Sequence, residues 1–292
     1  MTAKIRLTRK RRTWAEPRSA TLKGAPLNAV PAATSSKYQA SLDKLVRAMS
    51  KEYDREIRKL LADFKPEVSE LAMDASLASQ ARILFGWLGK KYAKLFASRS
   101  GDITERMING ASMASQRAVG ESLKKISGGL TIKVADMPGD LSEKITAATA
   151  ENVGLIKSIA TKYHEQVSQL VLRSISTGGN GAQDIYEGVK HYDDVTENRA
   201  KLIAVDQTRK VTTAMNVERS KSAGIKQFEW LHSGGGSEPR KLHVQYDGEI
   251  FYIDKPPVID ERTGERGFPG QLINCRCTMV PVLSFGEDGD NL

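Results

Sequence analysis

Apolar residues recur at three- and four-residue intervals through the first two-thirds of the chain, a spacing typical of amphipathic helices. The clearest segment can be capped by Ser35 or Ser36 and ends at or before Pro66. Its apolar positions are Leu42, Leu45, Val46, Met49, Tyr53, Ile57, Leu60, Leu61 and Phe64. This segment is predicted to form one long helix with a single buried face.

Further segments with the same spacing predict an elongated, mainly helical region. They cover residues 67–98, 103–126, 141–174 and 182–192. Ser100–Asp102 predicts a helix stop followed by a new cap, and residues 127–140 predict a loop that can hold a short strand at 130–134. Helices of this length and polarity favour packing on a partner or in a symmetric ring.

The last predicted helix leads directly into a different pattern. Asp194 or Thr196 can cap this helix, which reaches Ala223, and Gly224 suits the position just beyond a helix end. After Gly224, the stretches "IKQFEWL", "HVQYDGEIFYI" and "INCRCTMVPVL" alternate or run apolar as strands do. Asp247–Gly248 lies between apolar runs and predicts a tight hairpin. The fold class is therefore α+β, with a small antiparallel β-module after the helices.

Charge distinguishes the N-terminal segment from the rest of the chain. The net charge is +9, and half of the first twelve residues are basic: Lys4, Arg6, Arg9, Lys10, Arg11 and Arg12. Residues 13–34 lack a periodic apolar pattern and predict no fixed structure. The segment is either a solvated tail or a disordered arm that binds phosphates or an acidic partner.

These patterns divide the chain into four parts. They are a basic flexible arm (1–34), a long-helix region (35–194), a helix plus β-module (195–285) and an acidic tail (286–292). No run approaches the roughly 20 apolar residues of a membrane helix, and the basic N-terminus has no apolar core of a secretory signal. The 2 cysteines of a 292-residue chain do not form a disulfide framework. Folding in a reducing cytosol, without a membrane, is expected.

Cys275 and Cys277 are separated only by Arg276, which leaves several interpretations. A disulfide between them would close a strained loop and would be reduced in cytosol. Two residues apart in a strand, both thiols face one side, either as small core residues or as zinc ligands. Zinc would need partners such as His243 and His232, with Asp247 or Asp254 as substitutes. We predict reduced, inward-facing, structural thiols and no resident cofactor.

The same alternation places Arg276 on the opposite face of the predicted strand. There its guanidinium is expected to pair with a carboxylate such as Asp254 or Asp260.

Catalytic chemistry remains an alternative for the β-module. His232 and His243, with Lys241, have the residue types of a metal-free phosphodiesterase, one histidine acting as base and the other as acid. A cysteine–histidine nucleophile pair is a second possibility. No phosphate-binding glycine loop, dinucleotide fingerprint or His-Glu-x-x-His motif occurs. The preferred interpretation is that Arg240, His243 and Asp247 hydrogen-bond loops and fix the module, so the chain is predicted not to be an enzyme.

The final third of the chain resembles the phage head-morphogenesis domain, which is shared by the minor head protein F of phage Mu and similar minor capsid proteins. The stretches "AVDQTRKVTTAMNVERSKSAGIKQFEWLHS", "EPRKLHVQYDGEIF", "DKPPVI" and "FPGQLINCRCTMVPV" carry this resemblance. The matching residues are Asp206, Trp230, Arg240, His243, Asp247, Gly248, Asn274, Cys275, Arg276 and Cys277. Val205 stands where the family often has arginine, and "LHSGGGSEPR" replaces a commonly acidic turn.

The resemblance implies a minor head protein of a tailed bacteriophage. Such a protein acts in head morphogenesis at the portal or the procapsid interior, in host cytoplasm during assembly and then in the virion. The implied partners are the portal protein, capsid and scaffold proteins, and double-stranded DNA. The alternative is a packaged nuclease or toxin-like effector that is delivered with the phage DNA.

The basic arm yields a direct test of DNA contact. Neutralising about five phosphates gives a log–log salt dependence of duplex DNA affinity with a slope near −4 to −5. Deleting residues 2–12 is expected to flatten that slope, as measured by fluorescence anisotropy over a salt series. An unchanged slope would assign the arm to protein docking instead.

Overall fold

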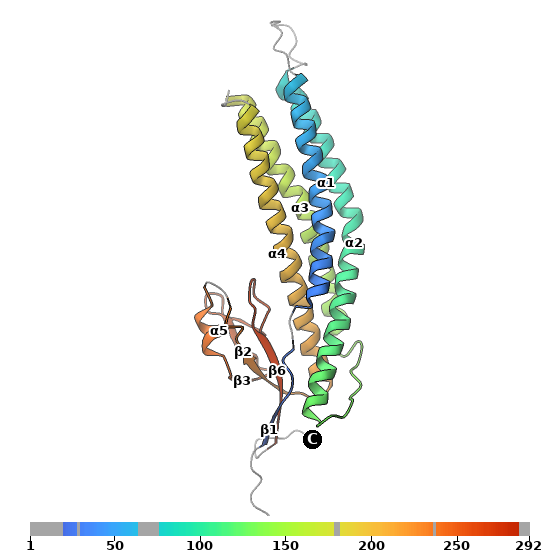
Figure 1. Cartoon of the computed structure of the whole chain (residues 1–292), viewed down its shortest axis with the longest axis vertical. Coiled ribbons are helices and arrows are strands. Elements are labelled where there is room, and N and C mark those ends of the chain that lie inside the picture. Colours follow the sequence, from blue (N-terminus) through green and yellow to red (C-terminus); the bar gives the residue numbers. More distant parts are fainter. Residues whose placement is uncertain (1–19, 28–29, 64–75, 178–181, 236–237, 286–292) are drawn as a thin grey trace, which may run out of the picture.

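Four long helices dominate the structure, a computed structural model that describes residues 20–27, 30–63, 76–177, 182–235 and 238–285 (Figure 1). They are α1 (Ala32–Asp63), α2 (Leu77–Ile126), α3 (Leu141–Thr177) and α4 (Ala182–Ser222). Each helix packs against the next in the chain where both are described, and α1 also packs against α4, which closes a bundle. The predicted fold class, an elongated helical region followed by a small antiparallel sheet, is confirmed.

The core of the bundle contains an aromatic cluster as well as aliphatic side chains. Tyr53 of α1 and Tyr163 of α3 are fully buried, and their rings meet edge to face with centroids 5.1 Å apart. Their hydroxyls remain paired, because Tyr53 contacts His164 Nδ1 at 2.9 Å and Tyr163 donates to Asp193 at 2.7 Å. Buried aromatic rings contribute strongly to such a core when their polar ends find partners.

Helix α2 is continuous where the sequence predicted two helices, so the predicted break at Ser100–Asp102 is wrong. The Ser100 hydroxyl donates to the Ala97 carbonyl at 2.9 Å, a bond made within the helix. Gly101 costs about 1 kcal/mol in a helix interior. Burial of Phe96 and Ile103 on either side of it outweighs that cost. Of the predicted helix over 67–98, residues 67–75 lie outside the described residues.

Two further secondary-structure predictions are corrected. Residues 182–192 and the helix predicted to start near Asp194 or Thr196 form one helix, α4, and Thr196 is buried within it. The predicted boundary between residues 194 and 195 thus falls inside a helix. Residues 127–140 form the predicted loop but contain no strand at 130–134. Within that loop only Val134 and Pro138 are buried, too little apolar contact to hold a strand in place.

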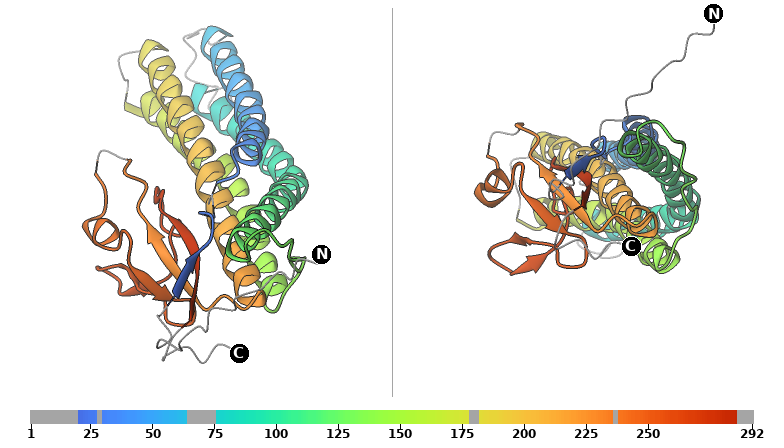
Figure 2. Two further views of the ribbon diagram at one scale, coloured as in Figure 1. Left: turned by 60° about the horizontal axis from the view of Figure 1, so that its bottom comes forward. Right: turned by 90° about the horizontal axis from the view of Figure 1, so that it is seen from below.

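A four-stranded antiparallel sheet follows α4 and lies beside the lower part of the bundle (Figure 2). Its spatial order is β1 (Ala20–Lys23), β6 (Thr278–Phe285), β2 (Gln227–Leu231) and β3 (Ile250–Tyr252). The register places Trp230 opposite Met279. A short helix, α5 (Lys241–Gln245), and a two-stranded ribbon of β4 (Val258–Asp260) and β5 (Glu265–Arg266) complete the module.

Strand β1 comes from the segment that was predicted to lack fixed structure, and that prediction is wrong for residues 20–27. It is also wrong for residues 32–34, which begin α1, so Ser35 and Ser36 lie within the helix and do not cap it. Ala20 pairs with Phe285 and Lys23 with Val282, so β1 covers one edge of β6. Leu27 is buried, and its N–H donates to the Met279 carbonyl at 2.8 Å. By pairing with β6, β1 satisfies backbone N–H and C=O groups of β6 that would otherwise have no hydrogen-bond partner in the sheet.

The module rests on the bundle through a second apolar core and one buried arginine. Val119 and Leu123 of α2 and Val217 of α4 pack with Phe228 and Trp230 of the sheet. Two residues after Val217 on α4, Arg219 is fully buried. Its guanidinium donates to the Ser112 carbonyl at 2.9 Å, the Ser112 hydroxyl at 2.7 Å and the Asp136 carbonyl at 2.9 Å. Arg219 therefore ties α4 to α2 and to the loop that follows α2.

None of the helices in the described part of the chain combines the length and the apolar character that a membrane span requires.

Replacing Arg219 with methionine is expected to lower the free energy of unfolding by about 2–4 kcal/mol, because buried carbonyl oxygens lose a charged donor. Urea denaturation followed by circular dichroism measures the change. Arg117→Met, at an exposed position of α2, is the matched control and should stay within about 0.5 kcal/mol of the parent. Equal midpoints for the two variants would contradict the tie between α4 and α2.

Candidate functional site

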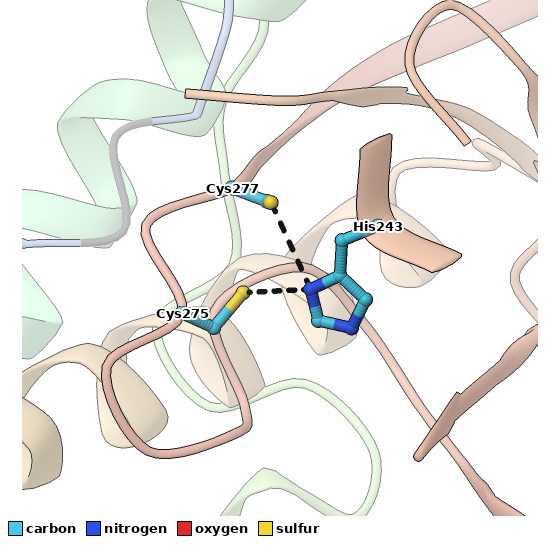
Figure 3. A group of neighbouring side chains, drawn as sticks. All are labelled: His243, Cys275 and Cys277. Atoms are coloured by element: carbon cyan, nitrogen blue, oxygen red, sulfur yellow. Dashed lines mark hydrogen bonds between the residues drawn. The ribbon is translucent and has the colours of Figure 1, made fainter. Parts of the chain in front are cut away.

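Three chemically reactive side chains converge inside the β-module. His243 comes from α5, and Cys275 and Cys277 come from the loop that enters β6 (Figure 3). Each is only 3% exposed. Their ligand atoms all lie within 4.8 Å of one another, the one such group of histidine, cysteine and acidic residues among the described residues. The three residues therefore form a compact buried cluster.

The local structure differs from the alternating strands that the sequence predicted. Residues 241–245 form helix α5, so His243 lies on a helix and not on a strand. Asp247–Gly248 connects that helix to β3 and is not the turn of a hairpin. Gly248 has a positive φ of 82°, and its N–H donates to the Trp230 carbonyl at 2.8 Å. The side chain of Asp247 accepts the N–H of His232 at 2.8 Å, which joins this turn to the end of β2.

The two cysteines precede β6 and do not lie within it. The Cys275 N–H donates to the Leu272 carbonyl at 3.0 Å, which forms a tight turn, and Asn274 adopts a left-handed φ of 59°. Both thiols are free and buried, as expected, but the turn directs them inward and not the alternation of a strand. Arg276 between them is exposed.

The hydrogen bond of His243 to a backbone carbonyl defines the tautomer of its neutral ring. Nε2 lies 3.0 Å from the carbonyl oxygen of Ile259, which can only accept a hydrogen bond. Nε2 must therefore carry the proton in the neutral ring, and Nδ1 presents a lone pair. Nδ1 lies 3.4 Å from the Cys275 sulfur and 3.9 Å from the Cys277 sulfur. The Trp230 ring packs edge-on against the imidazole with centroids 4.9 Å apart and holds its orientation.

The sulfur atoms have unequal surroundings. The pKa of Cys275 is lowered, chiefly by a hydrogen bond from the Cys277 thiol and further by backbone N–H groups, against the effect of burial. One of these donors is the Gly270 N–H, 3.3 Å from the Cys275 sulfur. The pKa of Cys277 is raised by Cys275 and by burial. The two opposite directions favour negative charge on Cys275 over negative charge on Cys277.

A basic side chain of α4 adds to this environment. Arg209 is buried, and burial lowers the pKa of its guanidinium, while the nearby Cys275 and Asp206 act in the opposite direction. The motif pattern did not identify Arg209 as a neighbour of the cysteines. Arg209 lies three residues after Asp206, so both side chains are on the same side of α4. This spacing was the sequence evidence that could have placed Arg209 near the site.

A pocket of about 520 Å³ opens over the cluster. Its wall includes His243 and both cysteines, together with His232, Arg240, Asn274 and Arg276. A molecule in solvent therefore reaches the thiols and the imidazole through a pocket whose wall is polar and partly basic. His232 lies on this wall, and its Nδ1 accepts the Gly234 N–H at 3.2 Å. It is not one of the residues whose ligand atoms fall within 4.8 Å of one another.

The other residues that the sequence predicted for the site lie at various places in the structure. Arg240 donates to the Ile273 carbonyl at 3.0 Å, which connects α5 to the cysteine loop. Trp230 is fully buried, and Asp206 lies on α4 with its carboxylate 3.4 Å from Lys210. Lys241 is exposed. The basic residues Lys4, Arg6, Arg9, Lys10, Arg11 and Arg12 lie outside the described residues.

The predicted pairing of Arg276 with Asp254 or Asp260 is wrong. Asp260 instead accepts the N–H of Arg262 at 2.9 Å, and that bond lowers the pKa of its carboxyl. Within the described part of the chain, Arg276 forms no ion pair. The prediction assumed that Arg276 stands on the outer face of a strand, whereas it lies in a loop at the pocket.

A four-helix bundle whose last helix supports a small sheet with a Cys-x-Cys and histidine cluster defines a two-part α+β protein. Residues 165–280 match the family described as "Phage Mu protein F like protein". This match includes the end of α3, all of α4 and nearly all of the module, and it confirms the resemblance inferred from the sequence.

A second comparison extends beyond the matched segment. An uncharacterized protein of Haemophilus influenzae is 29% identical over 253 residues, which cover 86% of this chain. The alignment covers 53% of that protein, so the chain spans about half the length of this curated relative. No solved structure matches the chain.

The left-handed turn at Asn274 can be tested by a pair of substitutions. Asn274→Gly is expected to leave stability close to that of the parent, whereas Asn274→Val should lower the free energy of unfolding by about 1–2 kcal/mol, because a β-branched residue disfavours positive φ. Asn274 is exposed, so lost packing does not complicate the comparison. Urea denaturation measures both variants, and equal stabilities would contradict the described turn.

Proposed function

We propose that this chain is a minor head protein of a tailed bacteriophage, which acts in head morphogenesis at the portal or the procapsid interior. The observation that carries the proposal is the family match over residues 165–280. These residues include α4 and the side chains of the sheet that pack against it, such as Val217, Phe228 and Trp230. The match therefore concerns a structural unit and not a scattered set of short motifs.

The helical bundle is the part that we assign to contact with the portal protein. An elongated bundle offers long helix faces, and α2 exposes two large apolar side chains one turn apart, Ile83 at 73% and Trp87 at 49%. Exposed apolar groups that lie together are typical of interaction surfaces. The basic arm is assigned to packaged double-stranded DNA, and capsid or scaffold proteins are the other proposed neighbours.

The portal assignment can be tested with the full-length chain. We expect tagged chain co-expressed with the portal protein of the same phage to co-purify with it. The double variant Ile83→Asp, Trp87→Ser should reduce recovery at least tenfold, because both positions are exposed and the bundle core stays intact. Val244→Asp, at an exposed apolar position of α5, is the matched control and should bind like the parent.

Loss of binding only in the Val244 variant would transfer the portal contact to the module. A packaged nuclease is the competing function, since a polar pocket lies over His243 and the cysteines. Incubation with labelled DNA and RNA, with and without EDTA, separates the two functions. Cleavage by the parent chain that His243→Gln abolishes would contradict a purely structural role.

A further inference from the structure

We propose that His243, Cys275 and Cys277 bind one Zn²⁺ ion, with the fourth coordination position directed toward the pocket that His232 and Arg276 line. Two thiols and one imidazole are the donor types that zinc prefers, and buried sites with this composition select it over hard cations such as Mg²⁺ or Ca²⁺. Zinc binding at this site does not depend on the proposed role in head assembly.

The separations between donor atoms fit a zinc ion without rearrangement. Zn–S bonds of about 2.3 Å and Zn–N bonds of about 2.0–2.1 Å at tetrahedral angles separate sulfur from nitrogen by about 3.6 Å. The two sulfur–nitrogen distances are 3.4 and 3.9 Å, one on each side of that value. The three donor atoms also lie within 4.8 Å of one another, which admits the sulfur–sulfur distance of a tetrahedral site, about 3.8 Å.

The imidazole is oriented as a metal ligand. The Ile259 carbonyl fixes the proton on Nε2, so the lone pair of Nδ1 points toward both sulfurs. A metal-binding histidine usually donates its other ring N–H to a carbonyl or a carboxylate in this way. The edge-on ring of Trp230 restricts rotation of the imidazole. The ligand is therefore held in position by contacts that do not involve the metal.

The loop that carries the cysteines is arranged in a similar way. A turn at Leu272–Cys275 and the left-handed Asn274 direct both side chains to one point although they are only two residues apart. The Gly270 N–H donates to the Cys275 sulfur at 3.3 Å, which stabilises charge on that ligand. Arg240 fixes the same loop through the Ile273 carbonyl. These contacts hold the ligand geometry in the folded module.

Nδ1 of His243 cannot serve both thiols by hydrogen bonding. Nδ1 has a single lone pair, so it can accept a proton from one thiol but not from both. Each sulfur is nonetheless within hydrogen-bonding distance of that one nitrogen, and all three side chains are buried. A cation at their centre contacts all three donors at once.

The fourth position is open because the described residues supply no further ligand. No fourth histidine, cysteine or acidic side chain within the described part of the chain joins the group at 4.8 Å. The three ligands instead line a pocket of about 520 Å³ together with Arg240 and Arg276. Three protein ligands with an exchangeable fourth position distinguish a reactive zinc site from a closed structural one. Water, or a small anion attracted by the arginines, would occupy that position.

Metal analysis of full-length chain purified without added metal tests the site. We expect roughly one zinc per chain in the parent and less than a tenth of that in the double variant Cys275→Ser, Cys277→Ser. His232→Gln is the matched control, because it alters the pocket wall but none of the three ligands, and it should retain zinc. Parent protein without zinc that also fails to take up added Zn²⁺ would overturn the proposal.

Cobalt substitution keeps the test independent of variants that fail to fold. Co²⁺ added to the parent chain, after zinc has been removed with a chelator, should produce the near-ultraviolet absorbance of a cobalt–thiolate bond. Added azide should then change the visible cobalt bands, because it enters the open position. Absence of the thiolate absorbance would overturn the site. Bands that do not respond to azide, or loss of zinc from His232→Gln, would overturn the open fourth position.

Discussion

Helix α4 has to bury its surface on two sides at once, and the rest of the structure is arranged around this requirement. Toward the bundle it contributes Ile203 and Met215, and toward the module it contributes Val217. A helix that is enclosed in this way must satisfy its polar side chains internally. Thr208 and Thr212 do so by donating to carbonyls four residues earlier, and Arg219 does so through α2 and the following loop. Other polar atoms of α4 are not satisfied in this way: Asp206 Oδ1, Asn216 Oδ1 and Ser220 Oγ are buried without a hydrogen-bond partner among the described residues.

The sequence predicted the helices well where packing and periodicity agree, and less well where a local signal conflicts with packing. Ser100–Gly101–Asp102 has the composition of a helix end, but the buried side chains on either side keep α2 intact. The reverse occurs at His243–Gln245, where apolar alternation resembles a strand although the segment is a single helical turn. Short elements are determined by tertiary contacts, which a local pattern does not contain.

Most of the candidate site could be anticipated as a set of residues but not as a geometry. The Cys-x-Cys motif and His243 were identifiable from residue type alone. The Ile259 carbonyl, which determines the tautomer of His243, and the Gly270 N–H, which contacts Cys275, carry no signature in the sequence because they are backbone groups. His232 was grouped with the cysteines by residue type, and only the fold separates it from their cluster.

The pairing of β1 with β6 constrains the order in which the sheet can form. Ala20 pairs with Phe285, so the two partners are synthesised at nearly opposite ends of the described chain. Loops of this length are slow to close, and an edge strand stays open to other partners until they do. The edge of β6 that β1 covers can be filled only after translation has passed residue 285. A β1 segment of a neighbouring copy has the same sequence and the same pairing groups, so this edge is the place in the sheet where strand exchange between nascent chains is expected.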